Sequence, residues 1–365
     1  MKDLLIIFGT RPEAIKLCPL IHEFGKREGL RARILVTGQH KELLDNALDA
    51  FGIVPDYRLD IPMGQSLPSL TAHILLGLEA ALPRPPHAII VHGDTSSALA
   101  AALFGFYMKI PVFHIEAGLR TYDMSHPFPE EFNRRAIALT AELHFAPTKR
   151  AMDNLLAEGV PKDKIFVTGN TAIDALSYTV KSDFSHPALL WAEKNKIIFL
   201  TAHRRESWGM PTENIFRAVA ALLDSKEGLR VIYPVHPNPL VRDTATKHFA
   251  HRSDVLLTEP LDAIECHNIM ARSHIILTDS GGIQEEAPSL GVPVLVTRNT
   301  TERPEGVEAG ALCLVGTDEK NIYSELCRLL DNKADYRSMS NAPNPYGDGR
   351  ASKRIADIIS KYFKE

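Results

Sequence analysis

Short apolar runs rich in β-branched residues alternate with helical patterns from one end of the chain to the other. This alternation constrains the fold more than any other feature, because strand–helix–strand units build parallel sheets with helices on their faces. A single hydrophobic core stops growing at about 250–300 residues. The chain has 365 residues, so the sequence predicts an α/β fold with two doubly wound parallel sheets in two domains.

The apolar runs fall into two series. We expect the strands of the first half at Leu4–Phe8, Arg33–Thr37, Ala88–His92, Val112–Ile115, Leu143–Ala146 and Ile165–Thr168. Those of the second half are expected at Ile197–Thr201, Val231–Val235, Val255–Thr258, Ile275–Thr278, Val294–Thr297 and Leu312–Val315. We therefore predict a Rossmann-like domain over residues 1–170, a second over 171–351, and a final helix over 352–365 that packs back on the first.

Charge and cysteine content limit the class of protein. A net charge of −4 argues against a general nucleic-acid binder, which needs a broad basic surface. The four cysteines are scattered without a CxxC pair, which indicates neither a metal site nor a disulfide framework. No basic and apolar leader opens the chain, and no apolar run has the length of a membrane span. We expect a cytoplasmic protein with no metal, nucleic-acid or membrane partner.

In the first half, polar residues follow the ends of several predicted strands, which is where open α/β sheets bind ligands. Arg11 and Lys16 lie on the first strand–helix turn, where cations and free N–H groups suit a diphosphate. Asp94 and Glu116 each follow a strand, and one helix joins the two strands. Such strands are parallel, and if they are adjacent the two carboxylates raise each other's pKa. The alternative for Asp94 is a helix N-cap.

The segment "HPFPEEFNRR" places acidic residues at a helix start and arginines one turn on. Glu130 and Glu131 are therefore either site carboxylates or ordinary helix-start acids that pair with Arg134 and Arg135.

The second half carries cations and glycines after its strands. His203 and Arg204 follow one strand and His236 follows the next. Ser280, Gly281 and Gly282 open a helix in "TDSGGIQEE", a geometry that cradles an anion, and Glu286 lies one turn later within reach of a ribose diol. The spacing differs from the dinucleotide fingerprint, so no NAD is expected.

Taken together, these segments resemble the non-hydrolysing UDP-N-acetylglucosamine 2-epimerases. The resemblance rests on stretches that occur in order over nearly the whole chain: "FGTRPEAIK", "HGDT", "EAGLRT", "PEEFNR", "HRRES", "PVHPNP", "TDSGGIQEEAPSLG", "TTERPEG" and "NPYGDG". It implies the GT-B fold, with two Rossmann-like domains and an active site in the cleft between them.

The resemblance also implies roles for individual residues. The catalytic residues would be Asp94, Glu116, Glu130 and His203. The UDP-sugar would be bound by Arg11, Lys16, Arg134, Arg204, His236, Ser280, Gly281, Gly282, Glu286 and Arg303. The implied reaction inverts C2 of UDP-N-acetylglucosamine through loss and re-addition of UDP, without a cofactor, in a homodimer that supplies N-acetylmannosamine-derived sugars for surface polysaccharide.

Other readings stay open at this point. A hydrolysing epimerase would release UDP and N-acetylmannosamine, and a related epimerase would act on a uronic-acid UDP-sugar. A GT-B glycosyltransferase would share the fold, and a nucleotide-sugar sensor would bind without catalysis.

Overall fold

The chain forms two compact units, each built on one parallel sheet. The computed structural model describes residues 1–38, 41–62, 64–82, 84–204 and 208–364. The first unit comprises Met1–Tyr178 and Tyr346–Glu365, and the second comprises Thr179–Pro345.

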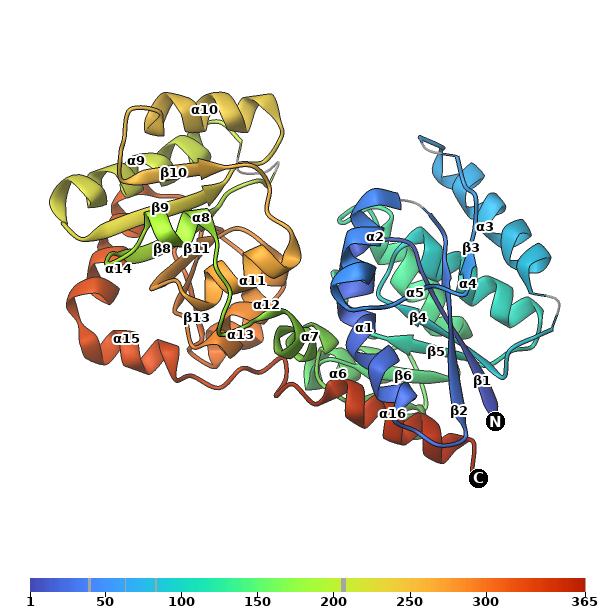
Figure 1. The fold of residues 1–365 in the computed structure, drawn as a ribbon. Helices are drawn as coiled ribbons and strands as arrows, with labels where there is room; N and C mark the ends of the chain where they lie inside the picture. The colour runs from blue at the N-terminus through green and yellow to red at the C-terminus, as the bar shows by residue number, and fades with distance from the viewer. Residues whose placement is uncertain (39–40, 63, 83, 205–207, 365) are drawn as a thin grey trace. The chain divides into compact units, whose positions relative to one another are not determined.

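The first unit holds a parallel sheet with strand order β3-β2-β1-β4-β5-β6-β7 (Figure 1). Its strands are β1 (Lys2–Phe8), β2 (Leu30–Val36), β3 (Tyr57–Arg58), β4 (Ala88–His92), β5 (Val112–Ile115), β6 (Leu143–Ala146) and β7 (Ile165–Val167). Its helices are α1 (Arg11–Gly25), α2 (Lys41–Ala50), α3 (Leu67–Ala81), α4 (Ser96–Tyr107), α5 (Glu130–Thr140), α6 (Lys149–Ala157), the 3₁₀ turn η1 (Lys162–Lys164), α7 (Thr171–Thr179) and α16 (Ala351–Tyr362).

Strand β1 explains why the first predicted strand is apolar without interruption. Leu4 and Ile6 belong to a core cluster that includes residues of α1, α2 and α16, whereas Leu5 and Ile7 belong to one that includes residues of α3 and α4. Successive side chains of a strand point to opposite faces. Because helices cover both faces of this parallel sheet, every residue from Leu4 to Phe8 is buried.

The C-terminal helix packs on the first unit, beside α1 in Figure 1. Ile355 and Ile359 lie in the core cluster that contains the even positions of β1. The Asp174 carboxylate of α7 accepts hydrogen bonds from the backbone N–H groups of Ala351 (3.1 Å) and Ser352 (2.7 Å) and so fixes the start of α16. Tyr178 also packs against this core, and the units therefore divide after Tyr178, whereas the sequence placed the boundary after residue 170.

The second unit holds a parallel sheet with strand order β10-β9-β8-β11-β12-β13. Its strands are β8 (Lys196–Thr201), β9 (Leu229–Pro234), β10 (Val255–Thr258), β11 (Ile275–Thr278), β12 (Val294–Val296) and β13 (Leu312–Leu314). Its helices are α8 (Pro187–Trp191), α9 (Met210–Ser225), α10 (Pro239–Phe249), α11 (Ala263–Ala271), α12 (Gly281–Glu286), the 3₁₀ turn η3 (Ala287–Leu290), α13 (Pro304–Glu308), α14 (Glu319–Asp331) and α15 (Lys333–Ser340).

Each predicted strand is present, with ends that differ by a few residues at most. Strand β3 was not predicted, because its two residues are too few to give a periodic pattern. Within the described residues, no helix combines the length and apolarity needed to cross a membrane.

Candidate functional site

The carboxyl ends of β4 and β5 place two acidic residues side by side. The strands pair in parallel with His92 opposite Ile115, as the sequence predicted for neighbours joined by one helix. Asp94 and Glu116 follow these strand ends directly. The two carboxylates therefore lie on one edge of the sheet, and the charge of Glu116 contributes to raising the pKa of Asp94.

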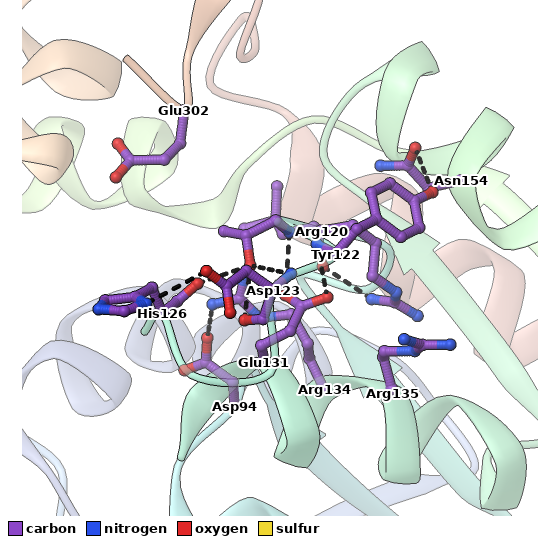
Figure 2. A network of polar contacts seen from close by, with 12 residues as sticks. Asp94, Arg120, Tyr122, Asp123, His126, Glu131, Arg134, Arg135, Asn154 and Glu302 are labelled. Carbon is purple, nitrogen blue, oxygen red and sulfur yellow. Dashed lines mark hydrogen bonds and ion pairs between the residues drawn. The ribbon is translucent and has the colours of Figure 1, made fainter. Parts of the chain in front are cut away.

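Asp94 is held by α5. Its Oδ2 accepts a hydrogen bond from Arg134 Nη2 at 2.5 Å (Figure 2). Its backbone carbonyl accepts one from Asn133 Nδ2 at 2.8 Å. The N-cap of α4 is Thr95, so Asp94 does not cap this helix. Burial raises the pKa of Asp94. The charges of Glu116 and Glu130 raise it further, whereas Arg134 lowers it. This carboxyl group thus combines partial burial with a single cationic partner.

Glu116 has a different setting. Its backbone is left-handed (φ +62°), a conformation that is uncommon for a residue with a side chain and concentrates at functional sites. Its Oε2 forms an ion pair with Lys16 Nζ and lies 3.8 Å from Nε2 of the buried His92. Burial lowers the pKa of His92 to about 4, so this imidazole is neutral at pH 7. Lys16, predicted in a diphosphate site, contacts a carboxylate here.

The two acidic residues at the start of α5, which the sequence could not separate, behave differently. Glu131 is fully buried and accepts the backbone N–H groups of Thr121 (3.0 Å) and Tyr122 (3.1 Å), so it fixes the preceding loop (Figure 2). The buried Oε2 of Glu130 has no hydrogen-bond partner among the described residues. Glu130 therefore keeps an acceptor for a ligand or water, whereas Glu131 is structural.

The first strand–helix turn is organised by Glu13, which the sequence reasoning missed. Its Oε2 accepts the N–H groups of Gly9 (3.0 Å) and Thr10 (2.9 Å), and its Oε1 accepts Thr95 Oγ1 at 2.7 Å. Burial raises the pKa of Glu13, while these hydrogen bonds lower it. Glu13 thus connects two turns. One leads into α1, which begins at Arg11, and the other carries Asp94. The Thr-x-x-Glu capping box was the available signal.

In the second unit, a buried carboxylate fixes the loop after β8. Asp279 follows β11, and its Oδ2 accepts the backbone N–H groups of His203 (2.6 Å) and Arg204 (2.8 Å). Its Oδ1 lies 2.9 Å from His203 Nδ1, and the His203 side chain is 38% exposed. The ring of His236 stacks on that of His203, with 6.0 Å between the ring centroids. Asp279 was not among the predicted site residues, and Arg205, predicted beside His203, lies outside the described residues.

Asp279 stays ionised because its donors outweigh its burial. Burial pushes the pKa of this carboxyl up, but the hydrogen bonds and charge of His203, with the N–H of Arg204, hold it below the ordinary value. A permanent anion at this place orients the His203 ring.

Ser280, Gly281 and Gly282, predicted to cradle an anion, lie at the start of α12. Ser280 is the N-cap, and its side chain makes no capping hydrogen bond. A Cβ on Gly281 would lie 2.9 Å from the Arg303 guanidinium, so this arginine is beside the cradle. A Cβ on Gly282 would meet only the Glu286 carboxylate, at 4.0 Å.

Side chains of α11 and α12 contact the two charged residues near these glycines, Arg303 and Glu286. Arg303 Nε donates to Glu285 Oε1 at 2.9 Å, and Glu286 Oε2 lies 3.3 Å from Nε2 of the buried His267. The turn thus combines helix N–H groups, an arginine and a carboxylate, which suits the diphosphate and ribose of a nucleotide.

The sequence of the chain is similar to those of known proteins. A family model described as UDP-N-acetylglucosamine 2-epimerase matches residues 22–360. The UDP-N-acetylglucosamine 2-epimerase of Bacillus subtilis is 52% identical, over 100% of this chain and 97% of that protein.

Two solved structures share the fold of the entire chain. The structure of S. aureus MnaA with UDP has a TM-score of 0.92 at 46% identity and covers 100% of this chain and 97% of that one. The UDP-GlcNAc 2-epimerase of Neisseria meningitidis bound to UDP-GlcNAc has a TM-score of 0.89 at 44% identity, over 98% and 100%. The predicted fold class is confirmed, and the chain belongs to the UDP-N-acetylglucosamine 2-epimerase family.

Proposed function

We propose that this chain interconverts UDP-N-acetylglucosamine and UDP-N-acetylmannosamine without hydrolysis. Two relatives support the ligand class, since one is solved with UDP and the other with UDP-GlcNAc. The observation that carries the proposal is the pair of carboxylates, Asp94 and Glu116, that follow neighbouring strands and lie against different cations.

The chemistry of the sugar requires such a pair. The proton on C2 is not next to a carbonyl group and is very weakly acidic, so direct removal is unrealistic. In the proposed route UDP leaves from C1 as a base removes the C2 proton, which gives 2-acetamidoglucal and UDP. UDP then adds back to C1 while an acid protonates C2 on the other face. One base and one acid with separated proton affinities are needed.

We assign the proton transfers to Asp94, Glu116 and Glu130. Partial burial and neighbouring carboxylates raise the pKa of Asp94, which favours a protonated donor at this position. Glu116 lies against Lys16, which favours its ionised form. Glu130 keeps a free acceptor among the described residues. The three groups therefore differ in the way that an acid and a base must differ.

We assign the nucleotide to the second unit. The N–H groups at the start of α12, with Arg303 and His203, would stabilise the charge of the departing diphosphate. Glu286 would accept hydrogen bonds from the ribose, and Arg204 and His236 would complete the contacts. In the first unit, the Arg11 side chain makes no hydrogen bond or ion pair to a described residue, so its positive charge would be available to an anionic ligand.

Proton NMR of the purified protein with UDP-N-acetylglucosamine tests the proposal. We expect an equilibrium mixture of the two epimers without stoichiometric release of UDP. Stoichiometric free UDP would replace the proposal with the hydrolysing reaction, and an unchanged substrate would contradict it.

The route is tested separately in deuterated water. Elimination and re-addition place solvent deuterium at C2 of the product and, with time, of the recovered substrate. Mass spectrometry of both sugars detects this incorporation. Epimerisation with complete retention of hydrogen would overturn the assignment of the carboxylates as acids and bases.

We also propose a cytoplasmic homodimer. None of the four cysteines, all of which lie in the described part of the chain, forms a disulfide, as suits a reducing compartment. Phe106, Tyr107 and Leu139 are exposed at 59%, 68% and 87% on α4 and α5, which pack together. Large exposed apolar side chains are enriched at interfaces when they form a patch. Sedimentation equilibrium at micromolar concentration tests this, and a monomer would contradict it.

A further inference from the structure

Asn170 contacts a proposed catalytic carboxylate from outside the motifs that define the site. It is 3% exposed and stands between β7 and α7. Its Nδ2 donates a hydrogen bond to Glu116 Oε2 at 3.1 Å, on the same oxygen that pairs with Lys16. Glu116 and Asn170 are 54 positions apart, so no local pattern connects them.

The amide group of Asn170 is held in one orientation. Its Oδ1 accepts the backbone N–H of Ala172 at 3.0 Å in the first turn of α7. With the oxygen committed to that N–H, the NH₂ group must be the part that faces Glu116. An aspartate or serine would keep the acceptor for Ala172. Only an amide carries its acceptor and its donor on two separate atoms, so that one side chain reaches both Ala172 and Glu116.

The backbone of Asn170 is fixed as well. Its N–H donates to the Tyr346 carbonyl at 2.7 Å, where the chain returns to the first unit. The approach is close, since a Cβ on Gly169 (φ +90°) would lie 3.3 Å from Gly347 Cα. Tyr346 is itself buried. Asn170 therefore has little freedom to move away from Glu116.

We propose that Asn170 is a positioning residue for Glu116, which it holds in the rotamer and ionised state used in proton transfer. Because Glu116 has a left-handed backbone, its side chain is not directed by a regular strand or helix, and the contacts with Lys16 and Asn170 direct it. The other titratable groups that act near it are His92 on β4 and Asp94 after β4. The inference rests on the proposed epimerase function.

The substitution Asn170→Asp separates positioning from capping. It keeps an acceptor for Ala172, removes the donor to Glu116 and adds a negative charge beside that carboxylate. A like charge disfavours ionisation, so the limb of the pH profile of kcat that Glu116 sets should move up by about one unit. On the acidic limb, below the pKa, one unit is a factor of ten in the ionised fraction, so we expect about tenfold lower kcat there, with kcat near pH 7 and KM little changed.

Two further variants keep the test decisive. Asn170→Ser retains the Ala172 acceptor without new charge and should lower kcat while the protein stays folded. Asn332→Asp is the matched control, since Asn332 likewise accepts backbone N–H groups at the start of α15 and is not one of the proposed site residues. It should leave kcat and the pH profile unchanged.

The outcomes distinguish the inference from the proposed function. Wild-type kcat and an unmoved pH limb in folded Asn170→Asp would reduce Asn170 to a capping residue and overturn the inference. If the wild-type protein fails to epimerise the sugar, the proposed function falls. The inference is then decided by ¹³C NMR titration of the Glu116 carboxyl group, assigned with Glu116→Gln: a higher midpoint in Asn170→Asp supports it, and an unchanged midpoint contradicts it.

Discussion

Asp94 and Asp279 occupy equivalent places in the two units, since each follows a strand at the carboxyl edge of a parallel sheet. The side chain of Asp94 is 27% exposed and bonded to one cation, and its pKa is raised. The side chain of Asp279 is 0% exposed and its pKa is lowered, because His203 and the N–H of Arg204 supply donors that outweigh burial. The comparison teaches that the number of donors, more than burial, decides whether the pKa of a strand-end carboxylate is raised, as at Asp94, or lowered, as at Asp279.

The largest expected effect tests the first side of this comparison. We predict that Asp94→Asn, Glu116→Gln and Glu130→Gln each lower kcat by about a hundredfold or more, the scale of a general acid or base. UDP affinity, measured by calorimetry, should change little, since the nucleotide is assigned to the second unit. Full activity in a folded variant would remove that residue from its role.

The second prediction tests Asp279 as a structural anion. Asp279→Ala leaves the N–H groups of His203 and Arg204 without their acceptor, which should lower the free energy of unfolding by about 1–3 kcal/mol. Asp279→Asn is the matched variant, because it keeps an acceptor and removes only the charge. Urea unfolding should find Asn closer to the wild type than Ala, and equal stability of all three proteins would refute the role.

The third prediction concerns pH and the separateness of the units. Burial lowers the pKa of His144 on β6 to about 4, below the value of about 6.5 in an unfolded chain. Because the unfolded chain takes up this proton first, the stability that the neutral ring contributes is complete above pH 6.5. It is lost as the pH falls toward 4, at up to about 1.4 kcal/mol per pH unit.

Substitution by glutamine isolates this term from the other titrating groups. The stability difference between wild type and His144→Gln should shrink on acidification, as measured by circular dichroism. Both tryptophans, Trp191 and Trp208, lie in the second unit, so their fluorescence should report a smaller change if the units unfold separately. A difference in stability that is constant between pH 6.5 and 4 would count against the assignment.

The smallest expected effects test the nucleotide site that we propose in the second unit. Gly282→Ala meets open space in the protein alone, so stability should hold while UDP binds more weakly, because the new Cβ obstructs the approach to the helix N-terminus. Glu286→Ala should weaken UDP severalfold, on the scale of about 1 kcal/mol for one hydrogen bond, and leave pyrophosphate unaffected. Calorimetry with both ligands measures this, and equal losses for the two would place the ribose elsewhere.

Much of the molecule follows from local patterns. Strand positions could be predicted because a strand buried on both faces needs an unbroken apolar run, as β1 and β4 have. The edge of the sheet that carries the site could be predicted because parallel strands bring their carboxyl ends together. That rule selected Asp94 and Glu116, and the glycines that open α12, as candidates from sequence alone.

Only the tertiary structure decided which polar groups do what, because their partners are distant along the chain. The capping box of Glu13 with Thr10 is local and readable, but its bond to Thr95 spans 82 positions. The bond of Asp279 to His203 spans 76 positions. Glu130 and Glu131 are identical in type and adjacent in sequence, yet they lie on different faces of the helix. Glu131 accepts hydrogen bonds inside the protein, whereas Oε2 of Glu130 has no hydrogen-bond partner among the described residues. Sequence determines the residue types at the site, while burial and long-range donors set their ionisation and hence their roles.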